Sequence, residues 1–359
     1  MNGNLLANSG RTPQSTKIEL AIKNIQMELP DFLSDYYLFL RGAVSASTRY
    51  AYLVDIRSFF QYICHYIICL ESGKEHDLKI DHLIELQPRV INLYLDHCRC
   101  YSKSIDGKLN VIENNNRSLS RKKSSLSSLF RFLYRNGQLP NDITPGFNPI
   151  KLPKPHDTTI KRLHSDEVKE LLEIVETGRG LSDTERVYWN KTKLRDRTIL
   201  LLFLTYGLRL SELTELNIGS INFRRKNFTI YRKRNKESVM PLNRTIENAL
   251  MDYINLERDN DSKSNALFLS LQKTRISNKS VRNLVKKYNS IVMKTTRNNG
   301  YSPHKLRATT ATLLIERGVS IFDVQNYLDH ENVTTTQLYA AHRNNVRVDI
   351  ADNFELDQL

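Results

Sequence analysis

Residues 302–342 constrain the chain more than any other stretch, because groups suited to phosphate chemistry stand there in a fixed order. Ser302 and Pro303 favour the N-cap and the first position of a helix. His304 and Arg307 follow three residues apart, so on that helix they share one face. A helix N-terminus already favours an anion, and an imidazole and a guanidinium beside it suit a phosphate oxyanion.

His330 and Tyr339 come later in the same stretch. A tyrosine can act as a covalent nucleophile when positive charge surrounds the group that it attacks. An imidazole can transfer a proton near neutral pH or hydrogen-bond to an oxyanion. Taken singly, a histidine–arginine pair on a helix is usually a solvated face, and one tyrosine among 17 is usually packing. Their occurrence in one order, with two basic motifs upstream, favours phosphodiester chemistry.

A second arginine is predicted to act together with the first. Residues 197–206 are apolar on every face, which predicts a buried helix that ends at Gly207. Arg209 follows, so its position is fixed by a buried element. Guanidinium groups are planar, permanently charged and bidentate toward phosphate, and we predict that Arg209 and Arg307 stabilise the charge that grows during cleavage. Glu212 is predicted to support the site by pairing with a basic neighbour.

Several motifs resemble the tyrosine recombinase (phage integrase) family, and within it the Xer-like recombinases. TYGLRLSEL at 205–213 is similar to the family's T-G-L-R-x-S-E-L, and KRNKESVMPL at 233–242 to its K-G-N-K-E-R-x-V-P-L hairpin. PHKLRATTAT at 303–312 matches P-H-x-L-R-x-T-x-A-T, and LDHENVTTTQLYAAH at 328–342 is similar to L-G-H-x(5)-T-x-x-Y-x-H. The resemblance covers about residues 30–345, in family order.

The resemblance implies a role for each group. Tyr339 attacks phosphorus and forms a 3′-phosphotyrosyl link, while His304 takes its proton or holds a phosphate oxygen. His330 hydrogen-bonds to another oxygen. Lys233 is the general acid for the leaving 5′-oxygen, with Lys236 as the alternative if the hairpin register differs. No clustered carboxylates accompany these residues, which argues against a two-metal nuclease, and neither a metal nor a cofactor is expected.

Two positions depart from the family pattern. Asp329 stands where glycine usually precedes the histidine, and aspartate tolerates a left-handed turn better than most residues. Its carboxylate is expected to keep His330 protonated and to tune the site without abolishing activity. Arg234 replaces the glycine after the hairpin lysine, so the geometry of that turn is also expected to differ.

The net charge, the hydropathy and the cysteines indicate which partners and which location to expect. A formal net charge of +14 favours a polyanionic partner, with nucleic acid as the default; the alternative is a merely soluble basic protein. No run of 18 apolar residues and no signal peptide occurs, so we expect a cytoplasmic, nucleoid-associated protein without membrane contact. Cys64, Cys69, Cys98 and Cys100 fall in apolar helical patterns and are predicted to be buried free thiols that bind no metal.

The apolar pattern predicts a mainly α fold. Four apolar stripes predict four helices before residue 148, with a surface loop over 106–116. The later half reads as helices, three short strands between 221 and 242 and a loop over 177–192. The resemblance implies a SAM-like core-binding domain and a mixed, mostly helical catalytic domain that close on DNA as a C-shaped clamp. The predicted regions are a flexible lead-in over 1–27, the core-binding domain over 28–148, a linker over 149–159, the catalytic domain over 160–342 and a tail over 343–359.

Basic residues outside the catalytic set are predicted to contact DNA. The cluster over 117–123 reads either as a solvated face or as a phosphate contact, and lysines of the extended linker can follow a backbone. The family's helical pattern places the start of the second helix and this cluster near the duplex. The predicted DNA contacts are Thr48, Arg49, Arg117, Arg121, Lys122, Lys123, Lys151, Lys154, Arg234 and Lys236.

The resemblance implies a site-specific recombinase that exchanges strands of double-stranded DNA through a Holliday junction. A homotetramer on two sites is expected, in which the tail over 343–359 docks on a neighbouring catalytic domain; the alternative is a tail that folds back on its own domain. Chromosome dimer resolution and mobile-element integration remain open, as does a translocase or directionality partner. A type IB topoisomerase-like enzyme and an inactive DNA-binding accessory protein are the competing functions.

Overall fold

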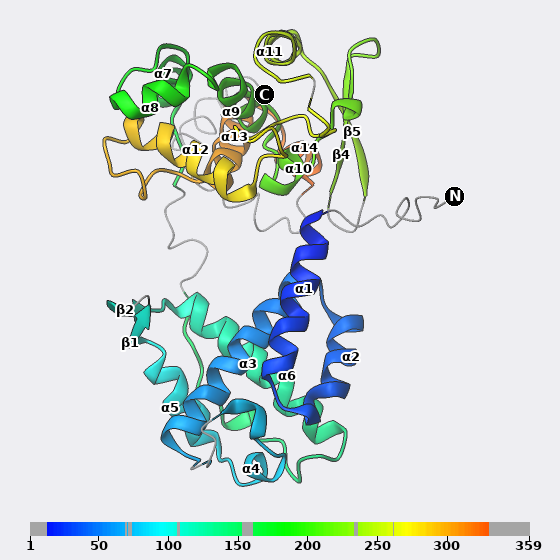
Figure 1. Cartoon of the computed structure of the whole chain (residues 1–359), viewed down its shortest axis with the longest axis vertical. Helices are drawn as coiled ribbons and strands as arrows, with labels where there is room; N and C mark the ends of the chain where they lie inside the picture. Colours follow the sequence, from blue (N-terminus) through cyan, green and yellow to red (C-terminus); the bar gives the residue numbers. More distant parts are fainter. Residues whose placement is uncertain are drawn as a thin grey trace, which may run out of the picture. The chain divides into compact units, whose positions relative to one another are not determined.

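The computed structural model describes residues 13–68, 70, 74–105, 108–152, 161–232, 236–260 and 262–329. Helices dominate these ranges and two small antiparallel sheets complete them, which confirms the mainly α prediction (Figure 1). The chain divides into two compact units, Met1–Pro153 and Lys154–Leu359, and each unit has an apolar core of its own. None of the helices in the described ranges is long and apolar enough to cross a lipid bilayer.

The first unit is a helical bundle. The four predicted helices are present in it, and local signals set their ends. The Ser45 hydroxyl accepts from the Thr48 N–H, Pro88 occupies the first turn of its helix, and Gly137 with φ 69° follows the end of the last helix. The helices are α1 (Pro13–Glu28), α2 (Ser34–Ala43), α3 (Ala46–Tyr66), α4 (Asp81–Ile84), α5 (Pro88–His97) and α6 (Asn116–Arg135).

The helix α1 corrects the prediction of a flexible lead-in over 1–27, which is wrong from Pro13 onward. Ile22 and Ile25 are buried, and α1 packs along α3. Glu19 accepts a hydrogen bond from Arg49 of α3 at 2.5 Å, and this half-buried contact stabilises the packing of the two helices. The segment is polar on average because only this narrow stripe is apolar, so composition concealed the helix.

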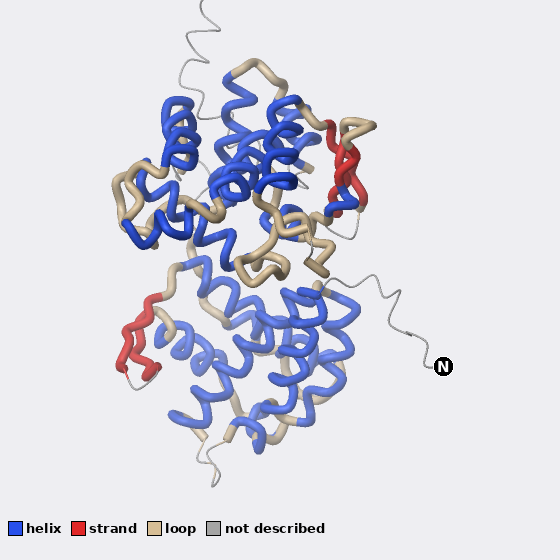
Figure 2. The backbone as a smooth tube through the Cα atoms, turned by 45° about the horizontal axis from the view of Figure 1, so that its top comes forward, coloured by secondary structure: helices blue, strands red, loops and turns tan. Residues whose placement is uncertain are grey.

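A β-hairpin replaces much of the loop predicted over 106–116. Strand β1 (Cys100–Ile105) pairs antiparallel with β2 (Lys108–Glu113), and Figure 2 shows the pair beside the helices of this unit. Of the apolar residues of β2, Leu109 and Val111 are 75% and 66% exposed and Ile112 is half-buried, so the sequence showed no buried face for this strand. Cys100 therefore lies exposed on a strand, contrary to the prediction of a buried helical thiol.

The two other cysteines in the described ranges differ in burial. Cys98 is buried and Cys64 is half-buried, and both are free thiols. Burial raises the pKa of the Cys64 thiol to about 11, with the nearby carboxylates of Glu75 and Asp77 adding to the effect. Cys69 lies outside the described residues.

The second unit is built around α9, the buried helix that the sequence predicts. Its residues Ile199, Leu200 and Leu202 are fully buried, and it packs against α7, α11 and α13. Gly207 ends it in the left-handed conformation. The helices of this unit are α7 (Ser165–Thr177), α8 (Asp183–Trp189), α9 (Lys193–Tyr206), α10 (Leu210–Thr214), α11 (Arg244–Leu256), α12 (Asn278–Val292), α13 (Pro303–Glu316) and α14 (Ile321–Leu328).

One local prediction in this unit is wrong. The loop expected over 177–192 contains α8, which begins with a capping box of Ser182 and Glu185. Trp189 at the end of α8 donates a hydrogen bond to the Val175 carbonyl at 2.7 Å. Glycines and mixed charges obscured the short helix.

The three predicted strands form one antiparallel sheet in the order β3–β4–β5. They are β3 (Ile221–Asn222), β4 (Asn227–Tyr231) and β5 (Glu237–Pro241), and Thr229 pairs with Val239. Just beyond β4, the Arg232 N–H donates to the Lys236 carbonyl at 2.8 Å and closes the base of the hairpin. Residues 233–235 at its turn lie outside the described residues.

Candidate active site

The corner between α9 and α10 positions Arg209. Gly207 has φ 57°, and a Cβ there would lie 2.6 Å from Cδ2 of Leu328, so the position requires glycine for both conformation and space. The Arg209 N–H donates to Glu212 Oε2 and its Nη1 donates to Oε1, both at 2.7 Å. The Glu212 side chain is only 2% exposed. Glu212 therefore orients Arg209 through its backbone and its guanidinium together.

Arg307 lies in the first turns of α13, which begins at Pro303 with Ser302 as N-cap. The residue is 4% exposed. Its Nη1 donates to the Gly207 carbonyl at 2.6 Å and its Nη2 donates to the Leu328 carbonyl. Arg307 thus joins the end of α9 to the end of α14, beside the corner that holds Arg209.

Several guanidinium groups donate hydrogen bonds to carbonyls at the C-terminus of α14. The last carbonyls of a helix lack partners within the helix, and the helix dipole makes this end attractive to cations. Arg232 donates to the Tyr327 carbonyl at 3.1 Å and to the Leu328 carbonyl at 2.9 Å, while Arg209 donates to the Asp329 carbonyl at 2.7 Å. Because these acceptors are uncharged, they hold the arginines together without neutralising them.

Arg232 is the residue of this cluster that sequence reasoning missed. It is 7% exposed and also donates from Nε to the Ser238 hydroxyl at 3.1 Å. The signal was present in β4, where Phe228 and Ile230 are buried. Continuing this alternation by two residues points Arg232 inward as well.

Asp329 adopts the left-handed conformation that its place in the motif suggests, with φ 53° and ψ 54°. Its Oδ1 lies 3.2 Å from Lys236 Nζ and its Oδ2 lies 3.6 Å from Arg209 Nη1. Burial alone raises the pKa of Asp329, but the hydrogen bond from Lys236 and the charges of Arg232, Lys236 and Arg209 outweigh it and lower the pKa. The carboxylate is therefore ionised and faces two cations; its expected neighbour His330 lies outside the described residues.

His304 lies in the first turn of α13 and is exposed. Partial desolvation lowers the pKa of its imidazole, and the charges of Lys305 and Arg307 lower it further. The ring is therefore neutral at neutral pH and can accept a proton. The remaining predicted catalytic and hairpin residues, Lys233, Arg234, His330 and Tyr339, lie outside the described residues.

The described part of the site carries an excess of positive charge. Four cations converge on the end of α14, and two carboxylates accompany them. No group of three or more His, Cys, Asp or Glu side chains that could hold a metal occurs in the described ranges. The four converging cations suit a phosphate or another oxyanion. The cations are Arg209, Arg232, Lys236 and Arg307, and the carboxylates are Glu212 and Asp329.

The predicted DNA contacts of the first unit fall into two groups. Lys122 is buried, with Nζ 3.2 Å from Asp55 Oδ1, and Arg121 donates to the same carboxylate. Burial raises the pKa of Asp55, and the charges of Lys122 and Arg121 oppose that effect. Arg49 is paired with Glu19. These three basic residues thus stabilise the packing of α1, α3 and α6.

The other predicted contacts of this unit are not part of these ion pairs. Arg117 and Lys151 are exposed, and Thr48 shares a hydrogen bond with Ser45 at 3.0 Å near the start of α3. Lys123 donates to the carbonyls of Phe147 and Asn148 at 3.2 and 2.8 Å. Lys154 lies outside the described residues.

The burial of Lys122 leads to a testable contrast. Lys122→Met leaves a buried carboxylate with one cation fewer, and we expect it to destabilise the first unit by about 2–4 kcal/mol. The control Arg117→Gln changes an exposed residue of the same helix and is expected to change stability by less than about 0.5 kcal/mol. Urea unfolding of both variants checks this. Unchanged stability in Lys122→Met would contradict the structural role.

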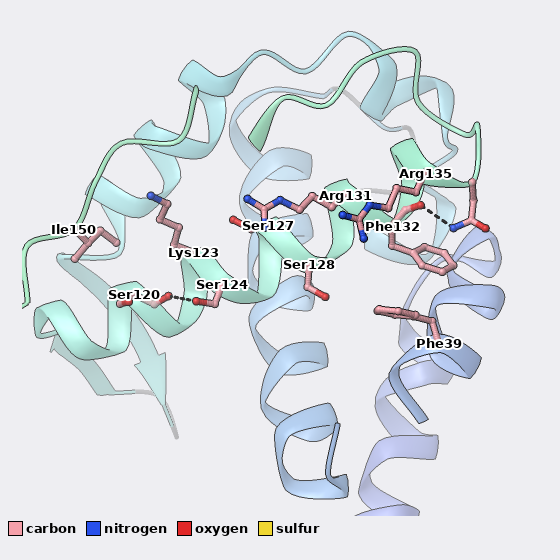
Figure 3. A pocket seen from close by; sticks show the side chains of 11 residues that line it. Phe39, Ser120, Lys123, Ser124, Ser127, Ser128, Arg131, Phe132, Arg135 and Ile150 are labelled. Atoms are coloured by element: carbon pink, nitrogen blue, oxygen red, sulfur yellow. Dashed lines mark hydrogen bonds between the residues drawn. The ribbon is translucent and has the colours of Figure 1, made fainter. Parts of the chain in front are cut away.

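A pocket of about 780 Å³ lies along α6 in the first unit (Figure 3). Lys123, Arg131 and Arg135 extend along it, and the rings of Phe39 and Phe132 lie 5.1 Å apart at one end. None of the described residues that line it is acidic. It is therefore a second basic surface that suits a polyanion, and Arg131 and Arg135 were not among the predicted contacts.

The chain is similar in sequence to known proteins. Residues 161–345 match the model of the phage integrase family. The tyrosine recombinase XerC of Haemophilus influenzae (strain PittEE) is 32% identical over 223 residues, 62% of this chain and 70% of that protein. XerC of Shewanella oneidensis is 30% identical over 257 residues, 72% of this chain and 78% of that protein.

Two solved structures have a similar fold. The site-specific recombinase XerH bound to a palindromic difH substrate, in a post-cleavage complex, has a TM-score of 0.62 at 17% identity and covers 95% of this chain and 84% of its own. A lambda integrase dimer bound to a COC′ core site has a TM-score of 0.60 at 16% identity and covers 87% and 95%. At these identities the likeness concerns the fold.

Proposed function

The chain belongs to the phage integrase family of tyrosine recombinases, and from that premise we propose that it recombines DNA at specific sites through a covalent 3′-phosphotyrosyl intermediate. The observation that carries the proposal is the convergence of Arg209, Arg232 and Arg307 on the C-terminus of α14. The end of α14, to which these arginines donate, immediately precedes in the chain the segment that contains His330 and Tyr339. We propose that this charge stabilises a scissile phosphate while Tyr339 attacks it.

In the proposed mechanism, Arg209 and Arg307 bind the non-bridging oxygens of the phosphodiester. The neutral imidazole of His304 accepts the phenolic proton as the Tyr339 oxygen attacks phosphorus, and the bond from phosphorus to the 5′-oxygen breaks. Lys233 gives a proton to that oxygen, which leaves as a hydroxyl. His330 donates a hydrogen bond to a phosphate oxygen. Attack by another 5′-hydroxyl reverses these steps, so no ATP, metal or cofactor is required.

The lowered pKa of His304 predicts the pH dependence of cleavage. A base must be neutral, so the single-turnover rate is expected to hold as pH falls to the ordinary histidine value of about 6.5 and to decline only below it. His304→Gln removes the proton acceptor and is expected to cleave about 100-fold more slowly, without that acidic decline. Rates measured from pH 5 to 8 check this. A decline that persists unchanged in His304→Gln would assign the titration to another group.

The assembly is proposed from the family and from its solved members on DNA. The core-binding domain over 28–148, the linker over 149–159 and the catalytic domain over 160–342 are proposed to clamp one duplex. Four protomers on two sites, linked by the tail over 343–359, are proposed to pass through a Holliday junction. Two roles are proposed from the family resemblance, chromosome dimer resolution and mobile-element integration, with a translocase or a directionality factor as partner on the nucleoid.

A plasmid assay distinguishes the proposed function from its competitors. The target site is first selected from genomic DNA around the gene, and two direct copies are placed on a supercoiled plasmid. We expect two recombinant circles from this plasmid and none from a one-site plasmid. Relaxation of both plasmids without recombinants would indicate a type IB topoisomerase-like enzyme. Specific binding without any product would indicate an accessory DNA-binding protein.

A further inference from the structure

We propose that Asp329 is a positioning residue whose carboxylate pairs with Arg209 and Lys236 in the DNA-free protein and is displaced by the scissile phosphate. The inference rests on the proposed function, because it concerns the same cationic cluster. Its basis is the position of one carboxylate between two cations from different elements, 3.6 Å from Arg209 Nη1 and 3.2 Å from Lys236 Nζ.

The backbone at Asp329 indicates that the side chain matters. Its φ of 53° is disfavoured for a residue with a Cβ, and glycine occupies such positions without strain. The Asp329 carbonyl already accepts from Arg209 Nη2 at 2.7 Å, a contact that any residue could make. What aspartate adds at this position is a negative charge directed at the cations.

The carboxylate also links the β4–β5 hairpin to α14. Arg232 holds the buried side of the hairpin base through its bonds to the Tyr327 and Leu328 carbonyls. Lys236, paired across the hairpin base with Arg232, reaches Asp329 on the exposed side. Arg232 thus holds the hairpin through neutral carbonyls, whereas Lys236 holds it through an ion pair with Asp329, which we call the charged tether. Only the charged tether competes with an anionic ligand.

The tether is weak enough to be displaced. The Lys236 side chain is 68% exposed and the Asp329 side chain is 25% exposed, so water screens their attraction. Arg209 keeps its bonds to Glu212 when Asp329 leaves, because these use other acceptor atoms. A phosphate can therefore replace the carboxylate as the partner of Arg209 and Lys236 while the buried part of the site stays in place.

Paired DNA-binding measurements test the displacement. In a Tyr339→Phe background, which prevents chemistry, Asp329→Asn removes the charge and keeps the shape. We expect it to bind a duplex with the native scissile phosphodiester about threefold to tenfold more tightly, the effect of one or two partly exposed ion pairs. A duplex with an uncharged methylphosphonate at that position is expected to bind equally to both proteins. An equal change on both duplexes, or none, would overturn the proposal.

Control variants isolate the charge. Asp323→Asn alters an exposed aspartate of the same helix and is expected to leave both affinities unchanged. Asp329→Gly relieves the backbone and removes the charge, and we expect the same preference for the charged duplex as in Asp329→Asn. Asp329→Glu keeps the charge and is expected to restore much of the competition.

A DNA-free measurement separates this inference from the proposed function. Hydrogen exchange of the amides over 236–240 is expected to be faster in Asp329→Asn than in wild type and unchanged in Asp323→Asn. Unchanged exchange in Asp329→Asn would refute the tether, whether or not the protein cleaves DNA. If wild type forms no covalent complex, the proposed function fails and the exchange result still decides the tether.

Discussion

Arg209→Lys is expected to lose strand cleavage and keep its fold, whereas Arg209→Ala is expected to lose both. Lysine retains a cation beside Glu212 but cannot donate to two oxygens from a planar fork. We therefore expect single-turnover cleavage to fall by about 10²–10³-fold, as when one preorganised donor is removed from an oxyanion site. Alanine also leaves the 2%-exposed Glu212 carboxylate without its cation, which is expected to cost about 3–5 kcal/mol of stability.

The two variants separate chemistry from folding. Cleavage is measured on a nicked duplex that traps the covalent product, and stability is measured by urea unfolding of the same preparations. Glu212→Gln is the matched variant on the other side of the pair, since it keeps one acceptor for the Arg209 guanidinium. Cleavage by Arg209→Lys at the wild-type rate would remove Arg209 from phosphate stabilisation and leave it a structural role.

Tyr339→Phe is expected to bind the target site with wild-type affinity and to form no covalent complex. The change removes one oxygen atom, and that oxygen is the proposed nucleophile. The loss is therefore expected to be complete within detection. DNA affinity is expected to be unchanged because the cations that bind phosphate are untouched. A native gel measures binding and a denaturing gel measures the covalent band.

Tyr327 provides the matched tyrosine control twelve residues earlier in the chain. Its hydroxyl donates to the Thr205 carbonyl at 3.1 Å, and burial, followed by the nearby Tyr206, raises its pKa, so it is held as a neutral structural group. Tyr327→Phe loses one hydrogen bond, worth about 1 kcal/mol, and is expected to retain cleavage. A covalent band in Tyr339→Phe that disappears in Tyr327→Phe would exchange the two assignments.

Predictions of the fold succeeded where one local signal determined the structure. The apolar stretch over 197–206 and Gly207 predicted α9 and its end, and the four apolar stripes predicted α2, α3, α5 and α6. The predictions failed where burial was partial. Helix α1 buries only a narrow stripe, and strand β2 leaves Leu109 and Val111 exposed, so neither showed the periodic pattern on which such predictions depend.

The site divides in the same way. Motif spacing identified Arg209, Glu212 and Arg307, which the structure brings together. It did not identify Arg232 or the partners of Asp329. Those roles arise from contacts with the end of α14, which lies 96 residues after Arg232 and 93 residues after Lys236 in the chain. A single sequence contains the charges of these residues but not the tertiary arrangement that makes them neighbours.

The most direct test of the account is to identify the residue that becomes linked to DNA. Wild-type protein is trapped on a nicked duplex carrying the selected site, the complex is digested with trypsin and nuclease, and the modified peptide is sequenced by mass spectrometry. We predict a nucleotide joined through its 3′-phosphate to Tyr339. A link to another residue, or a bound and intact duplex with no link, would contradict it.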